Sequence, residues 1–144
     1  MNTRYWYQYF MSSKYLPEQL LKGNEEFWMR YVIRGITKPV EEEAIKEYTR
    51  CYQIPDTLTT SANFYRTMFA DMKRWATSSA YLGKKHRMEA LIIHGQRDGV
   101  IVQEYYEGID NCFDDVSLEL VDAGHFVIEE KPEVVSRLLK AFFK

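Results

Sequence analysis

Cysteine, histidine and proline are scarce in this 144-residue chain, which has two, three and four of them. The two cysteines, Cys51 and Cys112, form no C-x-x-C pair, which excludes a disulfide framework and a cysteine zinc site and favours a reducing compartment. The histidines do not stand at metal-ligand spacing. We therefore expect neither a metal nor another cofactor.

Long apolar runs and an excess of positive charge are also missing. No run of 18 apolar residues occurs, and the start of the chain lacks the basic and apolar regions of a secretion signal. The formal net charge is -2, and the short basic segment 84–87 lacks the interleaved aromatics of a nucleic-acid platform. We expect a cytoplasmic protein that binds neither membranes nor nucleic acid.

Apolar residues make up 46% of the chain and charged residues 28%, as in an ordinary folded domain. Aromatic residues are unusually frequent at 15%, and most precede residue 82. Because tyrosine and tryptophan join an apolar body to a polar group, this bias fits either core packing or a pocket with a wet rim. Core packing is the simpler explanation for most of them.

Residues 1–82 are predicted to be helical, with a segment at 5–10 that is either irregular or helical. Pro17 in a first turn and Gly23 beyond a last turn are typical helix boundaries, and Asn24 and Asp56 are candidate caps. The predicted helices are 16–21, 25–34, 39–54 and 56–75. The last three helices each carry an apolar stripe: Phe27, Trp28, Tyr31 and Val32 in the second helix, Val40, Ala44, Tyr48 and Cys51 in the third, and Leu58, Ala62, Tyr65 and Phe69 in the fourth. The acidic run 41–43 is interpreted as a solvated first turn.

Two strands are predicted after a connection at 81–87. Residues 90–93 are apolar without alternation, which is typical of a parallel strand covered on both faces. Residues 116–120 alternate apolar and polar side chains, as in a half-exposed strand. Residues 102–112 are long enough for one crossover helix between the strands. A last helix starts at Pro132 and presents Val135, Leu138, Leu139 and Phe142 to the sheet.

Asp98 follows the first predicted strand, and His125 follows the second. Ligands of an open parallel sheet bind beyond the carboxyl ends of its strands, so these two side chains can meet there. An aspartate that accepts from one imidazole nitrogen fixes the tautomer and leaves the other nitrogen free to take a proton. Each residue alone is ambiguous, since such an aspartate is often only a helix cap and such a histidine only a solvated loop residue.

The two motifs together resemble the C-terminal part of the α/β-hydrolase fold. Gly95-Gln96-Arg97-Asp98 resembles the acid turn of that family. Ala123-Gly124-His125-Phe126 and the following Glu-Glu-Lys-Pro-Glu resemble its histidine loop and last helix, notably in epoxide hydrolases and haloacetate dehalogenases. The resemblance implies an α/β fold in which a helical cap (1–82) precedes the last two parallel strands and helices of the hydrolase sheet (83–144). It also implies that Asp98 is the triad acid and His125 the general base.

The helical part resembles the cap of epoxide hydrolases in residues 16–23 and 63–66. The resemblance implies that Tyr65 donates a hydrogen bond to an epoxide oxygen or helps to hold a halide. An ungapped alignment puts Trp6 at the other cap position, beside Tyr7, and these three residues are the predicted substrate contacts. Haloacetate dehalogenases have His-Trp at the positions of Tyr7-Gln8, so the chain lacks these residues of the halide-binding site. The implied substrate is a small apolar or electrophilic molecule, such as an epoxide or an ester-like compound.

The family's nucleophile precedes the cap on a G-x-Nuc-x-G elbow, and these 144 residues contain no such motif. Gly108-Ile109-Asp110 comes nearest, but no second glycine follows. We therefore expect a truncated, partial fold whose two-stranded sheet needs an N-terminal hydrolase half or self-association to cover its open edge. The leading hypothesis is a fragment of a hydrolase that uses a covalent ester intermediate and is inactive alone. The alternative is a non-catalytic binding module that uses the aromatic cap.

Overall fold

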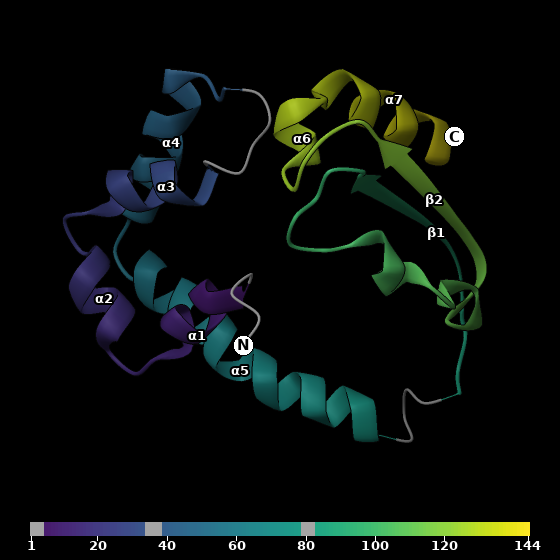
Figure 1. The fold of residues 1–144 in the computed structure, drawn as a ribbon, viewed down its shortest axis with the longest axis horizontal. Helices are drawn as coiled ribbons and strands as arrows, with labels where there is room; N and C mark the ends of the chain where they lie inside the picture. Colours follow the sequence, from purple (N-terminus) through teal and green to yellow (C-terminus); the bar gives the residue numbers. More distant parts are fainter. Residues whose placement is uncertain (1–4, 34–38, 79–82) are drawn as a thin grey trace. The chain divides into compact units, whose positions relative to one another are not determined.

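A computed structural model describes residues 5–33, 39–78 and 83–144 (Figure 1). The chain divides into two compact units, of which the first carries α1 to α5 and the second carries β1 to α7. Arg34 and Gly35, at the predicted end of the second helix, lie outside the described residues. So does the start of the predicted connection, including Leu82 at the predicted domain boundary.

The first unit is entirely helical in its described part. Its helices are α1 (Trp6–Ser12), α2 (Leu16–Leu21), α3 (Glu25–Ile33), α4 (Glu42–Tyr52) and α5 (Thr57–Thr77). Helix α5 packs against α1, α2 and α4, and α3 packs against α4. Gly23 ends α2 with a φ of 82°, a left-handed conformation that glycine adopts without steric cost. None of the described helices combines the length and apolar character of a membrane span.

The core of the first unit is built from Met11, Leu21, Trp28, Met29 and Ala62, with aromatic rings packed around them. Two predicted stripes are partly wrong. In α3 the buried residues are Glu25, Trp28 and Met29, whereas Phe27, which was predicted to lie on the apolar face, is 70% exposed.

Helix α4 also differs from the prediction. It begins at Glu42 and not at Pro39, because Glu41 has extended backbone angles. Its buried residues are Ile45 and Thr49, one position away from the predicted Ala44 and Tyr48. The acidic residues 41–43 are exposed, which confirms the prediction of a solvated first turn.

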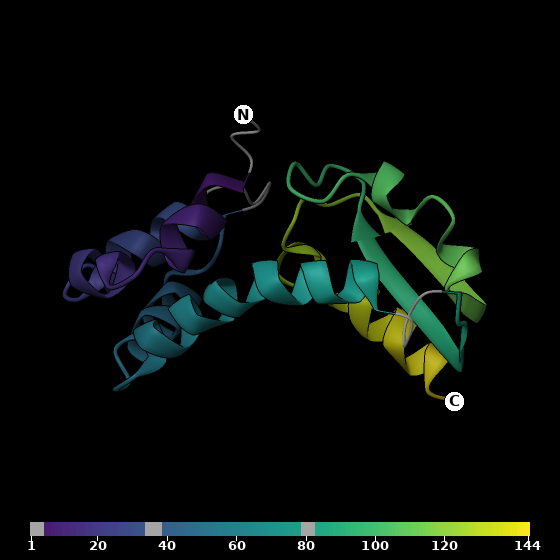
Figure 2. The same cartoon turned by 90° about the horizontal axis from the view of Figure 1, so that it is seen from below.

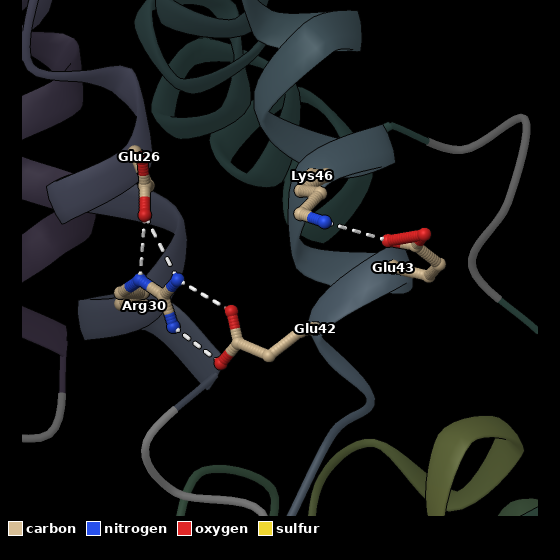
Figure 3. A network of polar contacts seen from close by, with 5 residues as sticks. All are labelled: Glu26, Arg30, Glu42, Glu43 and Lys46. Carbon is tan, nitrogen blue, oxygen red and sulfur yellow. Dashed lines mark hydrogen bonds and ion pairs between the residues drawn. The ribbon is translucent and has the colours of Figure 1, made fainter.

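A surface network joins α3 to α4 (Figure 3). The two terminal nitrogens of Arg30 donate to the carboxylate of Glu42 at 2.9 and 2.7 Å, and its Nε donates to Glu26 at 2.9 Å. Lys46 pairs with Glu43 on the first turns of α4. Since exposed ion pairs contribute little free energy, this network adds little to the stability of the unit.

The second unit contains a parallel pair of strands, β1 (His86–Gly95) and β2 (Phe113–Val121). The connection between them holds two 3-10 helices, η2 (Gln103–Tyr106) and η3 (Ile109–Asn111), and two helices follow β2, α6 (Val127–Glu130) and α7 (Pro132–Phe142). Figures 1 and 2 show the connection and α7 on opposite faces of the strand pair. The predicted parallel strands and the last helix at Pro132 are confirmed.

Four details of the second unit correct the predictions. The crossover at 102–112 is not an α-helix, because Gly108 adopts a φ of 76° and separates two short 3-10 segments. Strand β1 begins at His86, inside the predicted connection. Residues 90–93 are half-buried and not fully buried, and β1 has a neighbouring strand on one edge only within the described sheet. Leu120, the last apolar residue of the alternating run 116–120, is 36% exposed, and the following Val121 is buried.

Candidate active site

Asp98 and His125 meet at the carboxyl end of the sheet. The pairing of Gly95 with Val121 brings the two strands to the same level where they end. The acid turn (residues 95–98) leaves β1 and the histidine loop (residues 122–126) leaves β2, so their side chains converge. His125 Nδ1 lies 2.8 Å from Asp98 Oδ2, which is the juxtaposition expected from the sequence.

The Asp98 carboxylate is held by three hydrogen bonds. Its side chain is 4% exposed, and Oδ1 accepts from the N–H of Val100 at 2.7 Å and of Ile101 at 3.0 Å, while Oδ2 faces His125. Burial raises the pKa of Asp98, but the hydrogen bonds from His125 and the two backbone N–H groups outweigh it, and the pKa lies below its ordinary value. The side chain is therefore ionised at neutral pH. One oxygen holds the turn and the other orients the imidazole. Asp98 caps no described helix, because the next helical segment, a 3-10 turn, begins at Gln103 after Val102.

His125 is half-buried, with 31% of its side chain exposed. A carboxylate can only accept, so the neutral imidazole carries its proton on Nδ1 and has a free lone pair on Nε2. Its ring contacts Phe126 edge to face at 5.0 Å. This arrangement can take a proton from a water or hydroxyl at Nε2 while Asp98 stabilises the imidazolium.

Backbone contacts lock the acid turn against the histidine loop. Gln96 N–H donates to Val121 O at 2.8 Å, and Arg97 N–H donates to Ala123 O at 2.9 Å. A Cβ on Gly95 would lie 2.0 Å from Gly124 O and 2.7 Å from Ala123 O. Only glycine permits the histidine loop to come this close to β1. The motif therefore requires Gly95 because of this backbone contact and not because of an unusual φ.

Solved structures share this fold, although no family model and no curated protein sequence matches the chain. Cfl2 from Burkholderia cenocepacia aligns with a TM-score of 0.83 and 23% identity over 98% of this chain and 48% of its own. A Nostoc sp PCC 7120 protein classed with the α/β hydrolases gives 0.82 and 23% over 99% and 50%. An epoxide hydrolase from Bacillus megaterium, solved as a mutant, gives 0.72 and 18% over 99% and 54%.

This chain has the fold of the C-terminal part of an α/β-hydrolase. It spans about half the length of the solved structures that it matches. The fold predicted from the acid turn and the histidine loop is thereby confirmed. At these identities the likeness establishes the α/β-hydrolase fold alone, so the reaction and the substrate are matters of proposal.

Two buried polar residues of this hydrolase fold were not predicted as part of the site. Glu130 is 3% exposed, and its Oε1 accepts the N–H of Gly124 at 2.9 Å, next to His125. His94 is 5% exposed, and its Nδ1 lies 3.4 Å from the hydroxyl of Tyr106. Burial raises the pKa of Tyr106, and the charge of Asp98 adds to the effect. The sequence carries no signal that separates Glu130 from its neighbour Glu129.

The three predicted substrate contacts fall into two groups within the first unit. Tyr7 and Tyr65 meet edge to face at 5.9 Å, and burial, followed by the charges of Tyr7 and Tyr52, raises the pKa of Tyr65. Trp6 instead contacts Trp28 and Tyr31 at 6.3 and 5.6 Å. The structure therefore places Tyr7, and not Trp6, beside Tyr65. A role in substrate binding stays a prediction for all three.

Proposed function

We propose that this chain supplies the acid and the general base of an α/β-hydrolase that works through a covalent ester intermediate. The observation that carries this proposal is the 2.8 Å contact between a buried Asp98 carboxylate and His125 Nδ1. A base held in this way, with its second nitrogen free, suits the activation of water.

The proposed cycle has two steps. An aspartate on an elbow outside these 144 residues attacks an electrophilic carbon, which breaks the carbon–oxygen bond of an epoxide or the carbon–halogen bond of a haloacetate and forms an ester. His125 Nε2 then takes a proton from water while the water oxygen attacks the ester carbonyl, and Asp98 stabilises the imidazolium. In the first step the epoxide oxygen takes a proton from the Tyr65 hydroxyl, whereas a halide leaves as the anion. Cleavage of the ester passes the proton on His125 to the departing alkoxide and releases a diol from an epoxide or a hydroxy acid from a haloacetate. The nucleophile then loses its own proton, which restores Tyr65 or leaves with the halide, and is again a carboxylate.

Epoxides are the favoured substrate class. A tyrosine hydroxyl is protonated at neutral pH and burial raises the pKa of Tyr65 further, so this hydroxyl can donate to an epoxide oxygen. Tyr7 packs against it and can supply a second donor, whereas Trp6 belongs to a separate group of rings with Trp28 and Tyr31. The Bacillus megaterium epoxide hydrolase among the matching structures supports this class.

The nucleophile is proposed to come from an N-terminal hydrolase half that covers the open edge of β1, with self-association as the other way to cover it. The chain spans about half of the structures that it matches, which supports such a partner. We also propose a cytoplasmic location, which the free thiols of Cys51 and Cys112 support.

The test is a fusion of this chain to the part of the Bacillus megaterium epoxide hydrolase that it does not match. Turnover is measured on epoxide, haloacetate and aryl-ester panels. We expect epoxide hydrolysis that falls by about 10²-fold or more in His125→Ala, since a general base contributes about 10² to 10⁴. His86→Ala, at the opposite end of β1, is the control. Full hydrolysis by His125→Ala would contradict the proposal.

A non-catalytic binding module is the second candidate. The observation in its favour is the exposure of large aromatic side chains on the first unit, including Phe27 at 70%, Phe64 at 66% and Trp75 at 54%. Titration with apolar ligands, followed by the emission of Trp6 and Trp75, distinguishes the two functions. Saturable quenching together with an inactive fusion favours the module, whereas an active fusion without quenching removes it.

A further inference from the structure

Glu130 is a buried carboxylate at the end of α6 that the proposed chemistry does not use. It is 3% exposed, and it turns back to accept the N–H of Gly124 at 2.9 Å. A buried carboxylate lowers stability strongly unless hydrogen bonds replace the water that it has lost. An apolar residue would fill the same space without that cost, so the position of Glu130 requires an explanation.

The group that Glu130 holds is one peptide plane of the histidine loop. Ala123 C=O and Gly124 N–H belong to the same planar unit. Arg97 N–H donates to its oxygen at 2.9 Å from the acid turn, and Glu130 accepts from its nitrogen on the other side. Two bonds at opposite ends of a rigid plane fix its rotation. The plane therefore relates the backbone before His125 to the turn that carries Asp98.

Water cannot easily take over the part of Glu130. Ala123 and Gly124 are both buried, and Gly124 O lies so close to Gly95 that a Cβ there would come within 2.0 Å. Without the carboxylate, Gly124 N–H would be a buried donor lacking this partner, which is unfavourable. The plane would be expected to rotate toward solvent and carry His125 with it.

We propose that Glu130 is a positioning residue, whose hydrogen bond to Gly124 holds the Ala123–Gly124 peptide plane so that His125 Nδ1 stays on the Asp98 carboxylate. Its consequence for catalysis rests on the proposed hydrolase function, but the positioning itself does not. The acceptor oxygen is what matters, so glutamine should replace glutamate here and alanine should not.

The test reads the tautomer of His125 from long-range proton–nitrogen spectra of the full 144-residue chain, at a pH where the ring is neutral. Wild type is expected to carry the proton on Nδ1, and so is Glu130→Gln. Glu130→Ala should give a mixture of the Nδ1 and Nε2 forms, as for an imidazole free in water. Glu133→Ala is the matched control, because Glu133 is exposed in the first turn of α7.

A mixed tautomer in wild type would overturn the proposal. So would a folded Glu130→Ala that keeps the proton on Nδ1, or a folded Glu130→Gln that loses it. If Glu130→Ala does not fold, Glu130→Asp replaces it, since a carboxylate one methylene shorter should also lose Gly124 and give the mixture. In the fusion, we expect Glu130→Ala to lower kcat by about 10- to 100-fold at similar KM, with rescue by Glu130→Gln. An inactive wild-type fusion with the expected tautomers would refute the hydrolase function and support the positioning role.

Discussion

The Gly95→Ala substitution adds a methyl group where the histidine loop already lies. Its Cβ would be 2.0 Å from Gly124 O and 2.7 Å from Ala123 O, both backbone atoms that no rotamer change can move. Since ordinary contact begins near 3.4 Å, the loop must retreat by about 1.4 Å. Overpacking costs about 1–3 kcal/mol where side chains can adjust, so we expect about 3 kcal/mol here.

Native-state hydrogen exchange measures this effect within the second unit. The amides of Ile92 and His94 are suitable reporters, because Gln96 N–H donates to Val121 O and every second N–H of β1 before it also faces β2. A loss of about 3 kcal/mol should accelerate their exchange by about 100-fold. Gly99→Ala is the matched control, because a Cβ there has no atom within 4 Å. Equal exchange rates in the two variants would refute the argument that close backbone contact requires Gly95.

Three further changes have defined outcomes. Folding lowers the pKa of Asp98, so its ionised side chain stabilises the fold fully above about pH 4, and this stabilisation disappears as the pH falls through the pKa of the folded state. Urea unfolding at pH 7, 5 and 3 measures the effect. The stability lost in Asp98→Asn should become smaller as the pH falls. Arg66→Ala should lose about 2 kcal/mol by breaking a half-buried pair with Glu18, whereas Arg50→Ala, on an exposed pair, should change thermal unfolding little. Tyr65→Phe in the fusion should lower epoxide turnover more than ester turnover in parallel kinetic assays.

Periodicity was sufficient for most of the fold. The alternation at 116–120 and the apolar run at 90–93 each lie within a strand, and Pro17, Gly23 and Pro132 mark helix boundaries correctly. The prediction of a crossover helix at 102–112 was wrong. The segment is long enough for a helix, but Gly108 in its middle has a left-handed conformation that a helix does not accommodate. The buried residues of α4, Ile45 and Thr49, lie one position beyond the predicted Ala44 and Tyr48, because packing against the other helices decides which face of a helix is buried.

The candidate site was also predictable only in part. Asp98 and His125 were predictable because parallel strands end at one edge of the sheet, and sequence distance does not matter there. Glu130 was not, since a glutamate near a helix end is normally solvated, and only the loop that it folds back on makes it buried. The sequence could not decide whether Trp6 or Tyr7 lies beside Tyr65. These two neighbouring residues of α1 contact different groups of rings, which only the structure shows.

The most direct test of His125 as the base is the intact mass of the fused enzyme during a single turnover of an epoxide. Ester formation does not need His125, whereas its hydrolysis does. We predict that His125→Ala accumulates one covalent substrate adduct per chain, which wild type clears rapidly. A variant that shows no adduct and turns over as fast as wild type would contradict the central claim that Asp98 and His125 form the catalytic base of a hydrolase.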